Sequence, residues 1–107
     1  MINFEDFKKI ELRVAKILEA EEIKDSEKLI KLKVSLGEEQ REILAGIKKF
    51  YSSENLIGKN IVIVSNLEPK KMMGLESQGM LLAASGEDGE PVLIMPEKDV
   101  PPGSQIR

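Results

Sequence analysis

Alternating apolar and polar positions run through most of the chain, and this period-two pattern predicts β-strands. Ile10, Leu12 and Val14 alternate with charged residues in the first such segment. The alternation then slips, because Ile17 and Ala20 lie out of phase with Val14. A slip inside one long strand indicates a β-bulge or a sharp bend. We therefore expect a long, bent first strand.

Four further strands are expected along the chain. Apolar residues at every second position predict the second strand, in which Lys31 and Lys33 face the other way. The segment "NIVIVSN" is continuously apolar, which is typical of a strand buried on both faces. The four predicted strands span residues 30–36, 41–47, 60–66 and 78–85. A short strand in "VLIMP" and an extended tail, "VPPGSQI", follow them.

Two short helices and one loop complete the predicted elements. Asn3 followed by Asp6 has the spacing of a capping pair and predicts a helix over residues 4–9. The segment "SSENLIG" predicts one helical turn that a serine caps and Gly58 ends. Between the fourth and fifth strands, "NLEPKKMMGLES" predicts an exposed loop, in which Pro69 stiffens the entry and Gly74 permits an unusual backbone shape.

Five strands, a bent first strand and a helical turn between the third and fourth strands are typical of an OB-fold barrel. We expect an all-β protein: a five-stranded OB-fold barrel with a short N-terminal helix and a small β-rich C-terminal extension. The pattern shows no repeat and no linker, so residues 1–107 are expected to form one domain.

The composition excludes most kinds of catalytic site. The chain has no cysteine and no histidine, so it lacks a thiolate, the commonest general base and the commonest metal ligand. Neither a Walker loop nor a G-x-G-x-x-G motif is present. We therefore expect no enzymatic activity, no metal and no cofactor.

The longest apolar run has five residues, Met80 to Ala84, whereas a membrane helix needs about 20. The N-terminus is acidic and lacks a signal-peptide core. A cytoplasmic protein without a membrane segment is expected.

The net charge of −3 hides a basic part of the chain. Residues 8–71 hold 14 of the 16 Lys and Arg but only 11 of the 19 Asp and Glu, a local balance of +3. We expect Arg13 and Lys16 on the first strand to lie beside Lys31 and Lys33 on the second, on the face with which OB-folds bind oligonucleotides. The alternative is that these lysines only solvate the strand.

The four aromatic residues, Phe4, Phe7, Phe50 and Tyr51, all lie outside these strands. Binders of single-stranded nucleic acid stack bases on such rings. A folded RNA, recognised by shape, phosphates and 2′-hydroxyls, is therefore the better expectation.

Four segments, "DFKKIELRVAKILEAE", "EKLIKLKVSLGEEQREILAGI", "LIGKNIVIVSNLEPKKMMGLESQGMLLAA" and "PEKDVPPGSQI", cover nearly the whole chain. Together they resemble the tRNA-binding domain family, which includes the C-terminal domain of bacterial methionyl-tRNA synthetase, free-standing tRNA-binding proteins and cytokine-precursor domains. The most diagnostic part is Asn66-Leu67 followed by the lysines, Gly74 and Ser77-x-Gly79-Met80.

The resemblance implies an OB-fold that binds folded tRNA at the outer corner of the L, with little sequence readout, without catalysis, and in association with a methionyl-tRNA synthetase. It places the RNA contacts before the fifth strand, with Ser77 bonding a phosphate or a 2′-hydroxyl. The predicted RNA-binding residues are Asn66, Lys70, Lys71, Gly74, Ser77 and Met80, and the strand pattern adds Lys31, Lys33 and Arg13.

A homodimer is also expected, because a barrel of this size need not bury its own terminal apolar residues. The predicted interface residues are Phe4, Phe7, Pro101, Pro102 and Ile106. The alternative is that the N-terminal helix plugs one end of its own barrel.

Two other functions stay open. A related branch of the fold resembles a secretion-associated chaperone that binds peptides as a dimer, and a methionine-bearing groove suits peptides. The adjacent Lys70 and Lys71 favour RNA. A docking subunit for a synthetase that lacks its own appended domain is compatible with tRNA binding.

Overall fold

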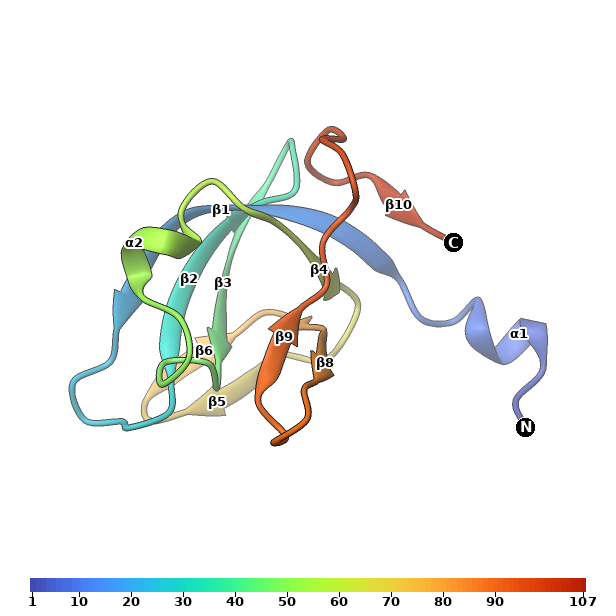
Figure 1. Ribbon diagram of the computed structural model, residues 1–107. Helices are drawn as coiled ribbons and strands as arrows, with labels where there is room; N and C mark the ends of the chain where they lie inside the picture. Colours follow the sequence, from blue (N-terminus) through green and yellow to red (C-terminus); the bar gives the residue numbers. More distant parts are fainter.

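One long strand organises the fold, as Figure 1 shows for the computed structural model of residues 1–107. This strand is β1 (Leu12–Glu22). Its first half pairs antiparallel with β4 (Asn60–Val64), and its second half pairs antiparallel with β2 (Ile30–Ser35). The register on β2 shifts between Ile17 and Glu19, which confirms the predicted bulge. Because a bulge bends and twists a strand, β1 can pair with strands on two sides of a barrel.

The main sheet has the order β3-β2-β1-β4-β7, where β3 is Gln40–Ala45 and β7 is Met80–Leu81. The sheet curls until β3 lies beside β6 (Leu75–Ser77) and β7. This is the strand order of an OB-fold barrel, so the predicted fold is confirmed.

The barrel interior is filled by aliphatic side chains from every long strand. Ile17, Ile30, Leu32, Ile43, Ile61 and Ile63 are among the fully buried residues. The helix α2 (Ser53–Leu56) adds Leu56, which is also fully buried, and the Ser52 hydroxyl caps this helix by accepting from the Asn55 N–H. The predicted helical turn is therefore present and covers one end of the barrel (Figure 1).

Three predicted segments differ in detail. The loop between the fourth and fifth strands contains a hairpin of β5 (Lys70–Met72) and β6. The predicted fifth strand is split into β7, which pairs with β4, and β8 (Ala83–Ser85), which pairs with β9 (Pro91–Leu93). The tail contains β10 (Gln105–Ile106), which pairs with β1 on the side opposite β4.

The N-terminal helix α1 (Phe4–Phe7) is shorter than expected, although the Asn3 side chain caps it at the Asp6 N–H as predicted. The helix has no buried residue and projects away from the barrel (Figure 1). The alternative in which this helix plugs its own barrel is therefore wrong. The barrel end is covered by Leu56 of α2 instead.

We predict that Leu56→Ala destabilises the domain, because it leaves a cavity at the end of the barrel. The expected loss is about 2–5 kcal/mol of unfolding free energy, measured by urea denaturation at fixed protein concentration. Ile57→Ala is the matched control: its side chain is 53% exposed, so a change of about 0.5 kcal/mol is expected. Equal losses for the two variants would contradict the role of α2 as a cap.

Candidate nucleic-acid interface

The β5–β6 hairpin carries the two adjacent lysines of the predicted site. Lys70 pairs with Ser77, Lys71 with Glu76, and Met72 with Leu75. Because neighbouring residues of a strand face opposite sides, Lys70 and Lys71 point to different faces of the hairpin. Both lysines are exposed, and neither forms an ion pair.

The hairpin turns in two residues, Met73 and Gly74, whose φ angles are 51° and 78°. Positive φ at both central residues defines the type I′ turn, whose twist matches that of paired strands. A Cβ atom added at Gly74 would meet nothing within 4 Å. Gly74 therefore shapes the turn, and the tip of the hairpin stands in open space.

The base of the hairpin is fastened to β3 by Ser77 and Gln78. The Ser77 hydroxyl accepts a hydrogen bond from the Leu44 N–H at 3.0 Å and donates one to the Gly79 carbonyl at 3.0 Å. Gln78 exchanges two hydrogen bonds with Glu42, one from its own N–H at 2.8 Å and one through its side-chain oxygen at 2.9 Å.

Ser77 is only 3% exposed. The expectation that its hydroxyl bonds a phosphate or a 2′-hydroxyl is corrected by this placement, because the hydroxyl is buried and already donates its one proton inside the protein. The residue holds the hairpin in place.

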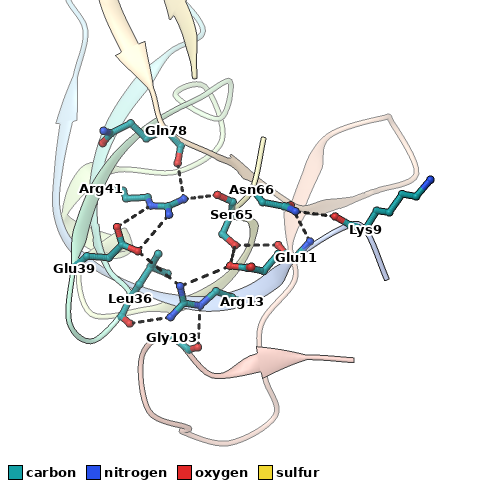
Figure 2. Close-up of polar contacts among 10 residues, drawn as sticks. All are labelled: Lys9, Glu11, Arg13, Leu36, Glu39, Arg41, Ser65, Asn66, Gln78 and Gly103. Carbon is teal, nitrogen blue, oxygen red and sulfur yellow. Dashed lines mark hydrogen bonds and ion pairs between the residues drawn. The ribbon is translucent and has the colours of Figure 1, made fainter. Parts of the chain in front are cut away.

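Arg41 was not identified from the sequence, yet it links both ends of this segment (Figure 2). Its Nη1 donates to the carbonyl of Ser65, at the end of β4, and to that of Gln78, after β6. Its Nε and Nη2 donate to the Glu39 carboxylate at 3.3 Å each. An arginine at the start of an amphipathic strand is ordinary, so the sequence offered no signal for this role.

Asn66 is exposed, but its amide ties the segment after β4 to the start of β1 (Figure 2). Its Oδ1 accepts from the Glu11 N–H at 2.9 Å, and its Nδ2 donates to the Lys9 carbonyl at 2.7 Å. Both polar atoms of the amide are thus engaged within the protein, which gives this predicted contact residue a positioning role.

A groove of about 480 Å³ lies beside the hairpin. Met80 is 49% exposed and Leu67 is 47% exposed, so the groove presents apolar surface to solvent next to the lysines. Its lining residues are Leu44, Leu67, Glu68, Lys70, Met72, Ser77, Gly79 and Met80. The structure therefore brings Lys70, Ser77 and Met80 of the predicted site together.

Lys31 and Lys33 lie in a separate cleft of about 600 Å³. We expected Arg13 and Lys16 beside them; this is wrong for Arg13, whereas Lys16 lies opposite Ser35, two residues along β2 from Lys33. The register places Glu21 opposite Lys31 and Glu19 opposite Lys33. Lys33 pairs with Glu19 at 3.4 Å, and Lys31 pairs with Glu21 and Glu42 at 3.6 Å each. An RNA phosphate would have to displace these carboxylates.

Arg13 lies elsewhere, where it joins the C-terminal tail to the β2–β3 turn (Figure 2). Its Nε donates to the Gly103 carbonyl at 3.1 Å, and its Nη2 donates to the Leu36 carbonyl at 3.4 Å. Its Nη1 lies 3.8 Å from the carboxylates of both Glu11 and Glu39. These contacts within the protein engage the whole guanidinium group.

The predicted interface residues occupy the two chain ends. Phe4 is 68% exposed, Phe7 is half-buried, and Pro101 is exposed. Pro102 and Ile106 are half-buried, and Ile106 pairs with Leu12 of β1.

No three acidic residues approach one another closely enough to form a metal-binding group. None of the helices is long and apolar enough to cross a membrane.

Comparison with known proteins gives matches over nearly the full chain. The family model described as "Putative tRNA binding domain" matches residues 12–105. The methionine–tRNA ligase of Caldanaerobacter subterraneus subsp. tengcongensis is 58% identical over 105 residues, which make up 98% of this chain and 16% of that ligase. The chain thus spans about one sixth of the length of this curated relative.

Two solved structures are similar over the whole chain. The MetRS-related protein from Pyrococcus horikoshii has a TM-score of 0.94 at 42% identity, covering 100% of this chain and 98% of that one. The chaperone CsaA from Bacillus anthracis strain Ames has a TM-score of 0.93 at 38% identity, covering 100% and 99%.

We predict that Ser77→Ala lowers stability by about 1–3 kcal/mol, because the buried N–H of Leu44 loses its acceptor. Urea denaturation measures this loss. Ser85→Ala is the matched control, since Ser85 is exposed and forms no side-chain hydrogen bond; it should change stability by at most about 0.5 kcal/mol. If Ser77→Ala leaves the unfolding free energy unchanged, this hydroxyl does not fasten the hairpin to β3.

Proposed function

The chain belongs to the tRNA-binding domain family, and from that membership we propose that it binds folded tRNA through the β5–β6 hairpin and the groove beside it. This surface is chosen because it holds the predicted RNA-binding cations that form no ion pair. Lys70 and Lys71 are exposed and form no ion pair, whereas Lys31, Lys33 and Arg13 are each paired with carboxylates.

The proposed recognition is by shape and phosphate contacts, with little sequence readout. No aromatic ring lies on the hairpin, so successive bases cannot stack there on a platform. Lysines neutralise phosphates, and phosphate contacts carry no sequence information. Folded RNA, which presents a fixed arrangement of phosphates and 2′-hydroxyls, fits this chemistry.

We further propose that the domain serves a methionyl-tRNA synthetase, either attached to it or as a separate subunit, in the cytoplasm. The matched ligase supports this proposal, because the chain corresponds to a small part of it. In this role the domain holds tRNA and contributes no catalytic group of its own.

A second function is favoured by one specific observation. The groove beside the hairpin presents exposed Leu67 and Met80, and adaptable methionines suit peptide side chains. The 38% identity with a chaperone supports the same alternative, in which an unfolded peptide occupies the groove.

We predict that the double substitution Lys70→Ala with Lys71→Ala weakens tRNA binding without unfolding the domain. Losing two phosphate contacts should flatten the slope of log K against log salt by about 1.8, taking roughly 0.9 per contact. Filter binding of unfractionated tRNA at several salt concentrations measures both the affinity and the slope. The loss should be similar for different tRNA species.

Lys98→Ala is the matched control for this experiment, because Lys98 is also exposed and unpaired but lies in the C-terminal extension. It should change neither affinity nor slope. If the double variant binds tRNA with unchanged affinity and salt slope, the hairpin is not the binding site. If an unfolded peptide then binds with higher affinity than tRNA, the chaperone function takes precedence.

We also propose that two copies of the chain pair through their terminal segments. Ile2 precedes the N-terminal helix and is 69% exposed, and Phe4 in the helix is 68% exposed. The helix has no buried residue, so an apolar surface is left uncovered. The tail segment with Pro101, Pro102 and Ile106 is the other part of the proposed interface.

Sedimentation at micromolar concentration should therefore give a particle of about twice the 12.0 kDa chain mass. Phe4→Ser with Phe7→Ser should shift it to a single chain mass, because polar groups replace the apolar contacts. Phe50→Ser is a suitable control, since Phe50 is 53% exposed but lies before α2, outside the proposed interface. A wild-type monomer would rule out the proposed pairing.

A further inference from the structure

Met73 occupies a backbone position that does not suit it. It is the only residue other than glycine with a positive φ, at 51°. Type I′ turns favour asparagine, aspartate or glycine at this place, because other side chains crowd the backbone there. A residue held in a disfavoured conformation is often kept for its function.

Packing does not account for the methionine either. Met73 is 53% exposed and is not part of the buried core. The side chain therefore stands at a free tip, where an asparagine would fit the turn better and a polar group would be better solvated. Fold stability alone favours a different residue.

The surroundings of Met73 indicate what it could contact. Lys70 and Lys71 lie on the strand just before it, exposed and without ion pairs, although Glu76 lies opposite Lys71, so phosphates can reach both lysines. A methionine thioether is polarisable and makes favourable contacts with aromatic rings. In RNA, the aromatic rings available to a protein are the base faces that loops and bulges leave unstacked.

We propose that Met73 caps the exposed face of an unstacked nucleobase in the bound RNA, while Lys70 and Lys71 neutralise the phosphates beside it. This inference rests on the proposed tRNA binding and adds a base-face contact to its phosphate contacts. Contact with a base face is sequence-tolerant, because every base has one. The hairpin thus distinguishes RNA with unstacked loop bases from a polyanion without bases.

The test is Met73→Asn, which replaces the methionine with a residue that the turn prefers. The thermal midpoint should stay the same or rise by a few degrees, since the backbone strain is relieved. Affinity for tRNA should nevertheless fall about two- to tenfold, the range expected for one lost sulfur–ring contact. The salt slope should not change, because no counterion release is lost.

Met95→Asn is the matched control, because Met95 is 44% exposed but follows β9 in the C-terminal extension. It should leave tRNA affinity unchanged. Long-chain inorganic polyphosphate provides a ligand that has phosphates and no bases. Its binding should be weakened by Lys70→Ala with Lys71→Ala and unaffected by Met73→Asn.

The outcomes separate this inference from the function on which it rests. If Met73→Asn binds tRNA as the wild type does while the double lysine variant binds weakly, the base contact is refuted and the hairpin site stands. If Met73→Asn weakens tRNA and polyphosphate equally, the methionine acts only through the shape of the hairpin and the inference is also refuted. If the double lysine variant binds tRNA normally, the proposed site itself fails.

Discussion

The barrel closes where β3 meets the chain that follows β4, and the position of the proposed site depends on this closure. These segments lie at the two ends of the sheet, and no regular strand ladder joins them. Arg41, Ser77 and Gln78 make the connection through side-chain hydrogen bonds to backbone groups. Arg41 is central because one guanidinium holds the carbonyls of Ser65 and Gln78, one on each side of the hairpin (Figure 2). The hairpin therefore leaves the barrel from two fixed points.

The cations predicted from the sequence to bind RNA fall into two groups. Arg13 and Arg41 share the Glu39 carboxylate, and Arg13 also contacts Glu11 just before β1 and Gly103 in the C-terminal tail. Lys31 and Lys33 are paired with glutamates on neighbouring strands. These cations stabilise the fold and are partly neutralised. Lys70 and Lys71 of the hairpin form no ion pair, although Glu76 lies opposite Lys71, so their charge is available to a polyanion while the chain as a whole is acidic.

The apolar pattern predicted the long strands and the bulge in β1, because both follow from which side chains are buried. The serine cap and Gly58 predicted the helical turn. The apolar pattern did not predict the β5–β6 hairpin, since three-residue strands are too short to show alternation and Met73-Gly74 is an unusual type I′ pair. Alternation also reveals which face a lysine occupies but not its cross-strand neighbour. Lys31 and Lys33 therefore lie opposite glutamates that the pattern could not place. The roles of Arg41 and Ser77 depend on contacts between distant segments, for which the sequence carries no local signal.

The central claim is that tRNA binds to the hairpin side of the barrel and not to the cleft of Lys31 and Lys33. Backbone amide NMR spectra recorded during titration with unfractionated tRNA test it most directly. We predict that the largest changes occur within residues 67–80, with small changes at Glu19, Glu21, Lys31 and Lys33. Changes centred on those four residues, with the hairpin unaffected, would contradict it.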